Sequence, residues 1–140
     1  MLLYQSNIQK SPTKLTKMEF NREELKAIAK IANAMIAADG KVDDNEMCSW
    51  TLEMERFGVA EKDFRTLYEQ SEEVDFVDAL GTISKFDEEQ KRYVGAFIGT
   101  LMAIDGDIDD AELKLWQLVS TFCNLPTMSL GEALEYMASL

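Results

Sequence analysis

The 140-residue chain has 26 acidic residues, 14 basic residues and no histidine, which gives a formal net charge of −12 at pH 7. Such an acidic surface repels nucleic-acid phosphates and anionic membranes, so neither is an expected partner. We find no secretory leader and no apolar run near the roughly 18 residues of a membrane span, so we expect a cytoplasmic protein without membrane insertion. With 46% hydrophobic residues, the chain is long enough to form one domain with its own core.

The N-terminal segment differs in composition from the rest of the chain. Residues 1–18 contain three lysines, no acid and no apolar period, which predicts a mobile N-terminal arm. The sequence leaves open whether translation starts at Met1 or at Met18. Residues 19–140 show helical spacing of apolar residues. We therefore expect one helical domain over 19–140.

The first predicted helix starts at a capping box, in which Asn21 is the N-cap and Glu24 the N3 residue. Its apolar positions recur at three- and four-residue spacing down to Ile36, and we expect it to end near Asp39. A second helix is expected from Asp43, with Glu46 at N3, up to Gly58. Two shorter helices are predicted over residues 61–70 and 73–85.

The pattern then starts again at Phe86. Asp87 is the expected N-cap of a helix that runs to Asp105, Asp109 and Glu112 form the next capping pair, and Ser129 opens a last helix. No segment shows the period-two alternation of a strand. The predicted fold class is therefore all-α, with about seven helices.

The two halves of the domain share a register. Asp105 lies 105 − 39 = 66 residues after Asp39, and the same offset relates other identical pairs. These include Phe20 and Phe86, Trp50 and Trp116, and Leu52 and Leu118. We interpret the shared residues as the apolar anchors and the acids of one structural unit. The chain uses this unit twice, in two lobes related by a pseudo-twofold axis.

Two glycines interrupt the second copy of the first helix. Gly95 and Gly99 each cost a helix about 1 kcal/mol relative to alanine. Their small-xxx-small spacing predicts a close crossing between this helix and the first one.

The duplicated stretch from Asp39 to Glu46 resembles the second half of an EF-hand loop. An EF-hand needs oxygen ligands at its first and third positions, but these positions fall on Met35 and Ala37, and on Leu101 and Ala103 in the second copy. The residues before Asp39 also belong to a helical stripe. An orthodox calcium loop is therefore excluded.

Two interpretations of the acids remain open. Asp43 and Asp109 as N-caps, with Glu46 and Glu112 at N3, need no ligand. Asp39 and Asp105, however, lie at the negative end of a helix dipole, where a carboxylate needs a donor or a cation. The second interpretation is a divalent-cation site, with Ca, Mg, Mn and Zn equally compatible. Its candidate ligands are Asp39, Asp43, Glu46, Asp105, Asp109 and Glu112.

The run Ala37-Ala38-Asp39-Gly40-x-Val42-Asp43-x-x-Glu46, with its second copy, resembles the TerB family associated with tellurite resistance. The resemblance covers about residues 20–140. It implies an all-helical, pseudo-symmetric module of stress response whose acidic positions have been proposed to bind metal. In this chain those positions are the six carboxylates named above.

An enzyme is the least supported class, because the chain has no histidine, no phosphate-binding loop and no nucleophile motif. Cys48 and Cys123 are expected to be free thiols. We therefore expect a non-enzymatic TerB-like module that binds a divalent cation. The alternative is an interaction or scaffold module whose acidic face docks a basic protein or a second copy, with acids that serve only as caps.

Overall fold

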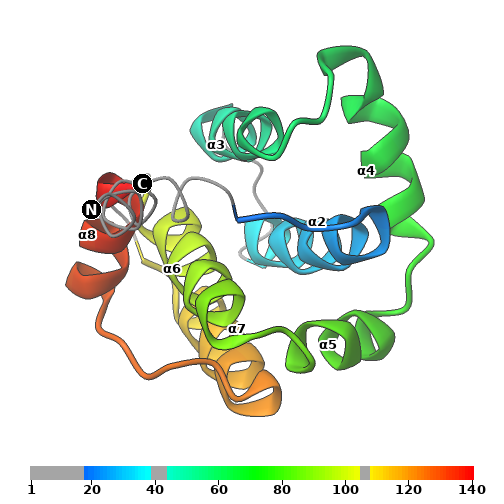
Figure 1. The fold of residues 1–140 in the computed structure, drawn as a ribbon. Coiled ribbons are helices and arrows are strands. Elements are labelled where there is room, and N and C mark those ends of the chain that lie inside the picture. The colour runs from blue at the N-terminus through cyan, green and yellow to red at the C-terminus, as the bar shows by residue number, and fades with distance from the viewer. Residues whose placement is uncertain (1–17, 39–43, 105–107) are drawn as a thin grey trace, which may run out of the picture.

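The computed structural model describes residues 18–38, 44–104 and 108–140, with residues 44–49 described through their backbone alone. These residues form seven α-helices and one short 3-10 helix, and they include no strand (Figure 1). The prediction of an all-α fold is confirmed. In chain order the elements are α2 (Arg22–Ala37), α3 (Asp44–Arg56), η1 (Glu61–Asp63), α4 (Phe64–Glu72), α5 (Phe76–Ser84), α6 (Glu88–Ala103), α7 (Asp110–Cys123) and α8 (Leu130–Ser139).

Several helices begin where local capping chemistry places them. The Asn21 side chain accepts a hydrogen bond from the Glu24 amide at 2.8 Å, and the Asn21 amide donates to Glu24 Oε1 at 2.9 Å. The same reciprocal box starts α6 at Asp87 and α8 at Ser129. These three predicted capping boxes are confirmed, because each depends only on residues three positions apart.

The middle of the chain differs from the prediction. The helix expected over residues 61–70 begins as the 3-10 turn η1 and continues as α4 to Glu72. The helix expected over 73–85 is the shorter α5, whose N-cap Asp75 accepts from the Val77 and Asp78 amides at 3.0 and 3.2 Å. The extra residues before Asp75 connect α4 to α5.

Helices α2 and α6 form the centre of the molecule. Helix α2 packs against α4, α5 and α6, whereas α6 also packs against α7 and α8 (Figure 1). Rings of Tyr93 and Phe97 stack in the core with centroids 5.7 Å apart. Trp50 and Trp116 are 2% and 9% exposed, which confirms their predicted place in the core.

The 66-residue offset recurs in the helix bounds. Helix α2 spans 22–37 and α6 spans 88–103, while α3 and α7 start at 44 and 110. The ring centroids of the equivalent residues Phe20 and Phe86 lie 5.3 Å apart. A pseudo-twofold relation between whole lobes stays a prediction. Leu52 and Leu118, however, are 57% and 51% exposed, so the prediction that they are core anchors is wrong.

The two glycines of α6 face a neighbour other than the predicted one. A Cβ on Gly99 would lie 2.8 Å from Trp116 Cζ2, and one on Gly95 would lie 3.2 Å from Met128 Cε. They therefore make room for side chains of α7 and of the segment before α8, not for the backbone of α2. The predicted arm over 1–18 lies outside the described residues except for Met18.

Candidate functional site

The duplicated acids fall at two helix-to-helix elbows of equal length. The first elbow joins Ala37 at the end of α2 to Asp44 at the start of α3, and the second joins Ala103 to Asp110. The last helical turn closes in the same way at both, since the Ala38 amide donates to Met35 O and the Ile104 amide to Leu101 O. Each elbow thus follows one central helix and precedes the helix that contains a buried tryptophan.

The structure describes only part of the predicted metal site. Asp39, Asp43 and Asp105 lie outside the described residues, as does the side chain of Glu46, which belongs to the first turn of α3. Asp109 and Glu112 are described completely. Whether all six carboxylates converge is therefore untested, and the predicted capping pair of Asp43 and Glu46 is untested as well.

Asp109 and Glu112 form a capping box at the start of α7. The Asp109 carboxylate accepts from the Ala111 amide at 2.7 Å, and the Asp109 amide donates to Glu112 Oε1 at 3.3 Å. Glu112 is only 2% exposed. This confirms the predicted capping role of the pair. Within the described ranges, no group of three or more His, Cys, Asp or Glu side chains is arranged to hold a metal ion.

A buried polar cluster joins α3 to α6, and the sequence analysis missed it. Tyr93 Oη donates to Glu53 Oε1 at 2.6 Å, and Arg56 Nε donates to the same oxygen at 2.9 Å. Glu53 is 5% exposed and Tyr93 fully buried. A signal for the cluster exists in the sequence, because Glu53 shares the apolar side of α3 with Trp50 and Phe57.

The electrostatics of this cluster favour a structural role. Burial, followed by the charge of Glu53, raises the pKa of Tyr93 well above its ordinary value. The hydrogen bond to Glu53 is the main cause of the raised pKa of Arg56. At neutral pH the phenol is therefore a donor that satisfies a buried carboxylate, and it is no nucleophile.

Cys123 is equally unsuited to catalysis. It is buried and free, and its thiol donates to Leu80 O at 3.4 Å. Burial raises the pKa of the Cys123 thiol to about 11, so the reactive thiolate is scarce at neutral pH.

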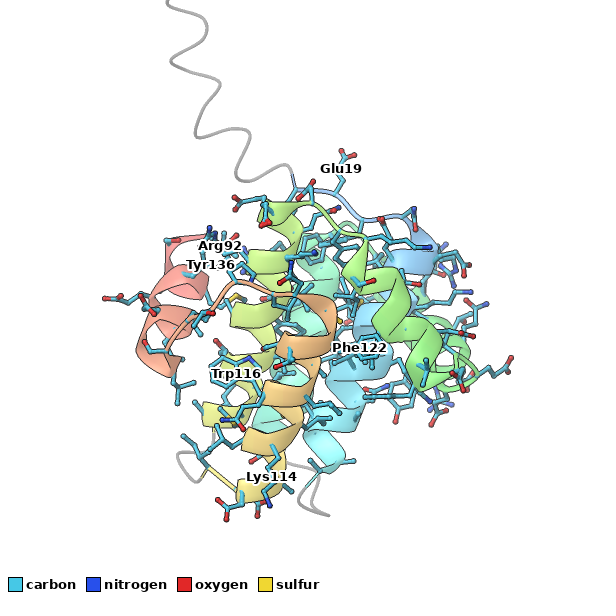
Figure 2. All side chains as sticks on the ribbon, turned by 90° about the horizontal axis from the view of Figure 1, so that it is seen from below. Glu19, Arg92, Lys114, Trp116, Phe122 and Tyr136 are labelled. Carbon is cyan, nitrogen blue, oxygen red and sulfur yellow. The ribbon has the colours of Figure 1, made fainter. Side chains whose placement is uncertain are left out.

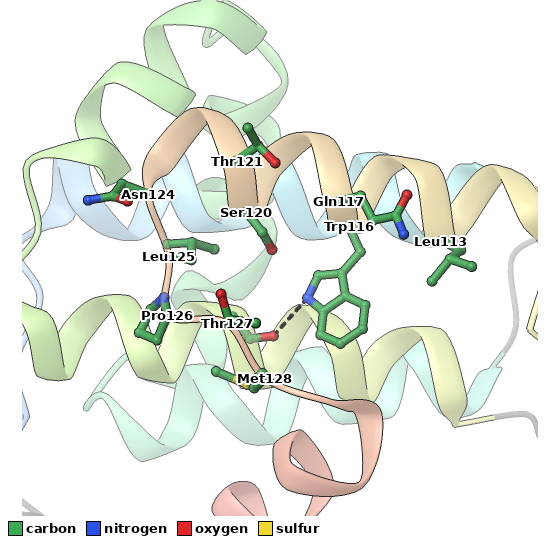
Figure 3. Close-up of a pocket in the computed structure, with 11 residues that line it drawn as sticks. Leu113, Trp116, Gln117, Ser120, Thr121, Asn124, Leu125, Pro126, Thr127 and Met128 are labelled. Carbon is green, nitrogen blue, oxygen red and sulfur yellow. Dashed lines mark hydrogen bonds between the residues drawn. The ribbon is translucent and has the colours of Figure 1, made fainter.

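A groove of about 410 Å³ lies between α7 and the segment that connects it to α8 (Figure 3). The Trp116 indole forms one wall and donates from Nε1 to Gly95 O at 3.1 Å. All residues that line the groove are uncharged, among them the amides Gln117 and Asn124. Such a lining offers neither an acid–base pair nor a set of metal ligands.

The fold and the elbows define a small all-helical domain. No known family model matches the sequence, and a search of curated proteins finds no match. A crystal structure of a protein of unknown function from Porphyromonas gingivalis is similar, with 44% sequence identity and a TM-score of 0.75. The match covers 86% of this chain and 98% of that one. The chain belongs to the same family as that protein.

Proposed function

We propose that this protein is a non-enzymatic stress-response module of the TerB type that binds a divalent cation at its two acidic helix elbows. The observation that supports this most is the common register of the elbows. The aspartates of each set follow the end of a central helix, at Ala37 or Ala103, and the glutamate lies in the first turn of the next helix, which starts at Asp44 or Asp110. A spacing kept at two separate places indicates a role for the acids that the apolar pattern does not require.

Helix dipoles make a cation useful at this place. Asp39 and Asp105 follow within two residues of the last residue of α2 and α6, where carbonyl groups concentrate negative charge. A carboxylate there is unfavourable without a positive partner. A hard divalent cation accepts carboxylate and carbonyl oxygens together, so it offsets both charges at once.

Capping and metal binding are compatible at Asp109. A carboxylate has two oxygens and about four acceptor positions. Asp109 Oδ1 accepts from the Ala111 amide at 2.7 Å, which leaves acceptor positions on the carboxylate for a cation. The net charge of −12 also raises the local concentration of cations around the protein.

Three further observations support a non-enzymatic role. Cys123 is buried with a raised pKa, Tyr93 is fully buried, and the groove beside Trp116 has an uncharged lining. The resemblance to TerB rests on the duplicated acidic stretch. The family relative is a protein of unknown function, so it adds no activity to this proposal.

Calorimetric titration of the whole chain tests the proposal. We expect calcium, magnesium, manganese or zinc chloride to give a saturable heat and a raised melting temperature at millimolar concentration. Free metal at ten times the dissociation constant stabilises the folded state by about 1.4 kcal/mol. An Asp39→Asn, Asp105→Asn double variant should lose both effects.

Asp87→Asn is the matched control. Asp87 is also an N-cap with a reciprocal box, but it lies outside both elbows. Asparagine caps a helix about as well as aspartate, so this variant should fold and bind metal like the wild type. Absence of heat and of any melting shift with all four metals at millimolar concentration would overturn the proposal.

A further inference from the structure

Gly81 in α5 is a glycine that the fold does not explain. A Cβ on Gly99 or Gly95 would meet atoms of Trp116 or Met128, whereas a Cβ on Gly81 would meet nothing within 4 Å. Glycine in a helix interior costs about 1 kcal/mol relative to alanine. No neighbour among the described residues requires the absence of a side chain there. The bare backbone therefore suits an approach from outside the chain.

An exposed apolar side chain lies beside the contact of α5 with α7 that this glycine adjoins. Helices α5 and α7 touch where Cys123 Sγ donates to Leu80 O at 3.4 Å. Gly81 follows Leu80 in the chain, and Phe122, which is 54% exposed, precedes Cys123. Figure 2 shows Phe122 on the side of the molecule where α5 and α7 lie. Beside this contact, α5 therefore has a residue without a side chain, and α7 has an exposed aromatic ring.

Two further apolar residues extend this surface. Val77, one turn before Gly81, is 60% exposed, and Leu118, one turn before Phe122, is 51% exposed. Helix α7 has no charged residue from Leu115 to Cys123, although the chain as a whole is strongly acidic. We call Val77, Gly81, Leu118 and Phe122 the α5/α7 patch.

The charges beside the patch come as one acid and one base. Asp78 lies three residues before Gly81 and Lys85 four residues after it, so both share its side of α5. Both are exposed, and neither forms an ion pair with any described residue. In an antiparallel crossing of two α5 helices at Gly81, each Asp78 faces Lys85 of the second copy.

We propose that the α5/α7 patch is a homodimer interface, in which two α5 helices cross antiparallel at Gly81. The patch is complementary to a second copy of itself in two respects. It pairs the exposed Phe122 ring with Gly81, which has no side chain, and it has Asp78 and Lys85 beside it as an acid and a base. A twofold axis brings each feature to its counterpart twice, as an isologous interface requires. Two chains of charge −12 repel each other, and a patch with one acid and one base adds little to this repulsion.

A charge swap tests this interface with the whole chain. Sedimentation equilibrium should show a wild-type dimer at micromolar concentration. Asp78→Lys or Lys85→Asp alone should place like charges in contact and weaken dimerisation at least tenfold. The double variant Asp78→Lys, Lys85→Asp should restore the dimer, because the pair is only reversed.

Matched controls separate the interface from net charge. Glu61→Lys and Lys62→Asp change the net charge by the same amounts at exposed positions of η1 and should leave the dimer intact. A Cβ at Gly81 meets nothing within 4 Å in the monomer, so Gly81→Leu should keep the wild-type secondary structure while it abolishes the dimer.

Three results of these dimerisation experiments would overturn the proposal. The first is a wild-type chain that stays monomeric up to 100 times a micromolar concentration. The second is a double charge-swap variant that dimerises as weakly as its single variants. The third is a Gly81→Leu variant that still dimerises. Binding of another protein to a monomeric chain through the same patch would equally contradict it.

Discussion

Helices α3 and α7 occupy equivalent positions in the register, yet they dock on α6 by different chemistry. Helix α3 uses a buried ionic cluster, in which Glu53 accepts from Tyr93 of α6 at 2.6 Å. Helix α7 uses an indole, with Trp116 Nε1 donating to Gly95 O at 3.1 Å. The position 66 residues after Glu53 is the buried Val119.

The 66-residue repeat determines some features of the two halves and leaves others free. It sets where helices begin and end and which tryptophans are buried. It does not set the polar contacts between helices, which involve residues specific to each half. The elbow acids belong to the repeated part, and this is why the proposed cation site is placed there and not at the Glu53 cluster.

Trp116→Ala should have the largest effect on the half that contains α7. The substitution leaves a cavity against Gly99 and removes the donor to Gly95 O. We expect a loss of about 3–5 kcal/mol in the free energy of unfolding, measured with urea. Trp50→Ala is the equivalent change, and its cost should be lower because Trp50 contributes ring packing on Phe97 instead of this hydrogen bond. A larger cost at Trp50 would contradict the comparison.

Tyr93→Phe should weaken the half that contains α3. It removes a donor to a buried carboxylate, and hydrogen bonds to charged groups contribute about 1.5–3 kcal/mol. Urea unfolding at pH 7 measures the loss. The matched control Tyr136→Phe removes a bond to the exposed Glu89 and should cost clearly less.

The same tyrosine gives a prediction for alkaline pH. The pKa of Tyr93 is raised in the folded state above the ordinary value of 10.0, so the folded protein keeps the phenol proton to a higher pH than the unfolded chain does. The corresponding stability is fully present below pH 10 and is lost as the pH rises further. Cys123, raised from 9.0 to about 11, adds a loss that begins near pH 9.

Tyr93→Phe should therefore flatten the fall in stability above pH 10, and Cys123→Ala should flatten the part between pH 9 and 11. Melting temperatures recorded from pH 7 to 11 check both. Identical pH profiles in the wild type and both variants would contradict the buried, protonated state of these groups.

Gly99→Ala and Gly95→Ala test how closely α7 and the segment before α8 pack against α6. At Gly99 the new methyl group would meet the rigid indole at 2.8 Å, so we expect a loss of about 1–2 kcal/mol despite the better helix propensity. At Gly95 it would meet the flexible end of Met128 at 3.2 Å, and the stability should stay within about 0.5 kcal/mol of the wild type. Equal costs at the two positions would show that the indole moves aside.

Asp109→Ala should have a small effect on stability. It removes the cap of α7 and should cost about 1 kcal/mol in urea unfolding. Asp109→Asn, which keeps the cap, should cost a few tenths at most. A loss with Asn as large as that with Ala would mean that the negative charge, and not the cap, stabilises this elbow.

Local and distant interactions differ in how far the sequence predicts them. The caps at Asn21, Asp87 and Asp109 follow from residues three positions apart, so they were predictable. The bond between Glu53 and Tyr93 joins residues 40 apart, and the side of α6 that Gly99 presents depends on where α7 packs. The helical period places Glu53 on the apolar side of α3, but it does not identify the partner of Glu53 or the neighbour that the glycines face. This is why the partner of the glycines was predicted wrongly.

The elbows also show why part of the site stays a prediction. Asp109 and Glu112 are settled by a local capping box. Convergence of Asp39, Asp43 and Asp105 depends on elbow geometry outside the described residues, and no helical period encodes it. The acids were recognisable only because the chain repeats them at the same offset.

A crystal structure determined with millimolar calcium tests the central proposal most directly. We expect an ion at each elbow, with carboxylate oxygens of Asp39 or Asp105 within about 2.3–2.6 Å. Asp109 should contribute its second oxygen while it still accepts from the Ala111 amide. Elbows without an ion, in which all six carboxylates accept only from helix amides, would contradict metal binding and leave the acids as caps.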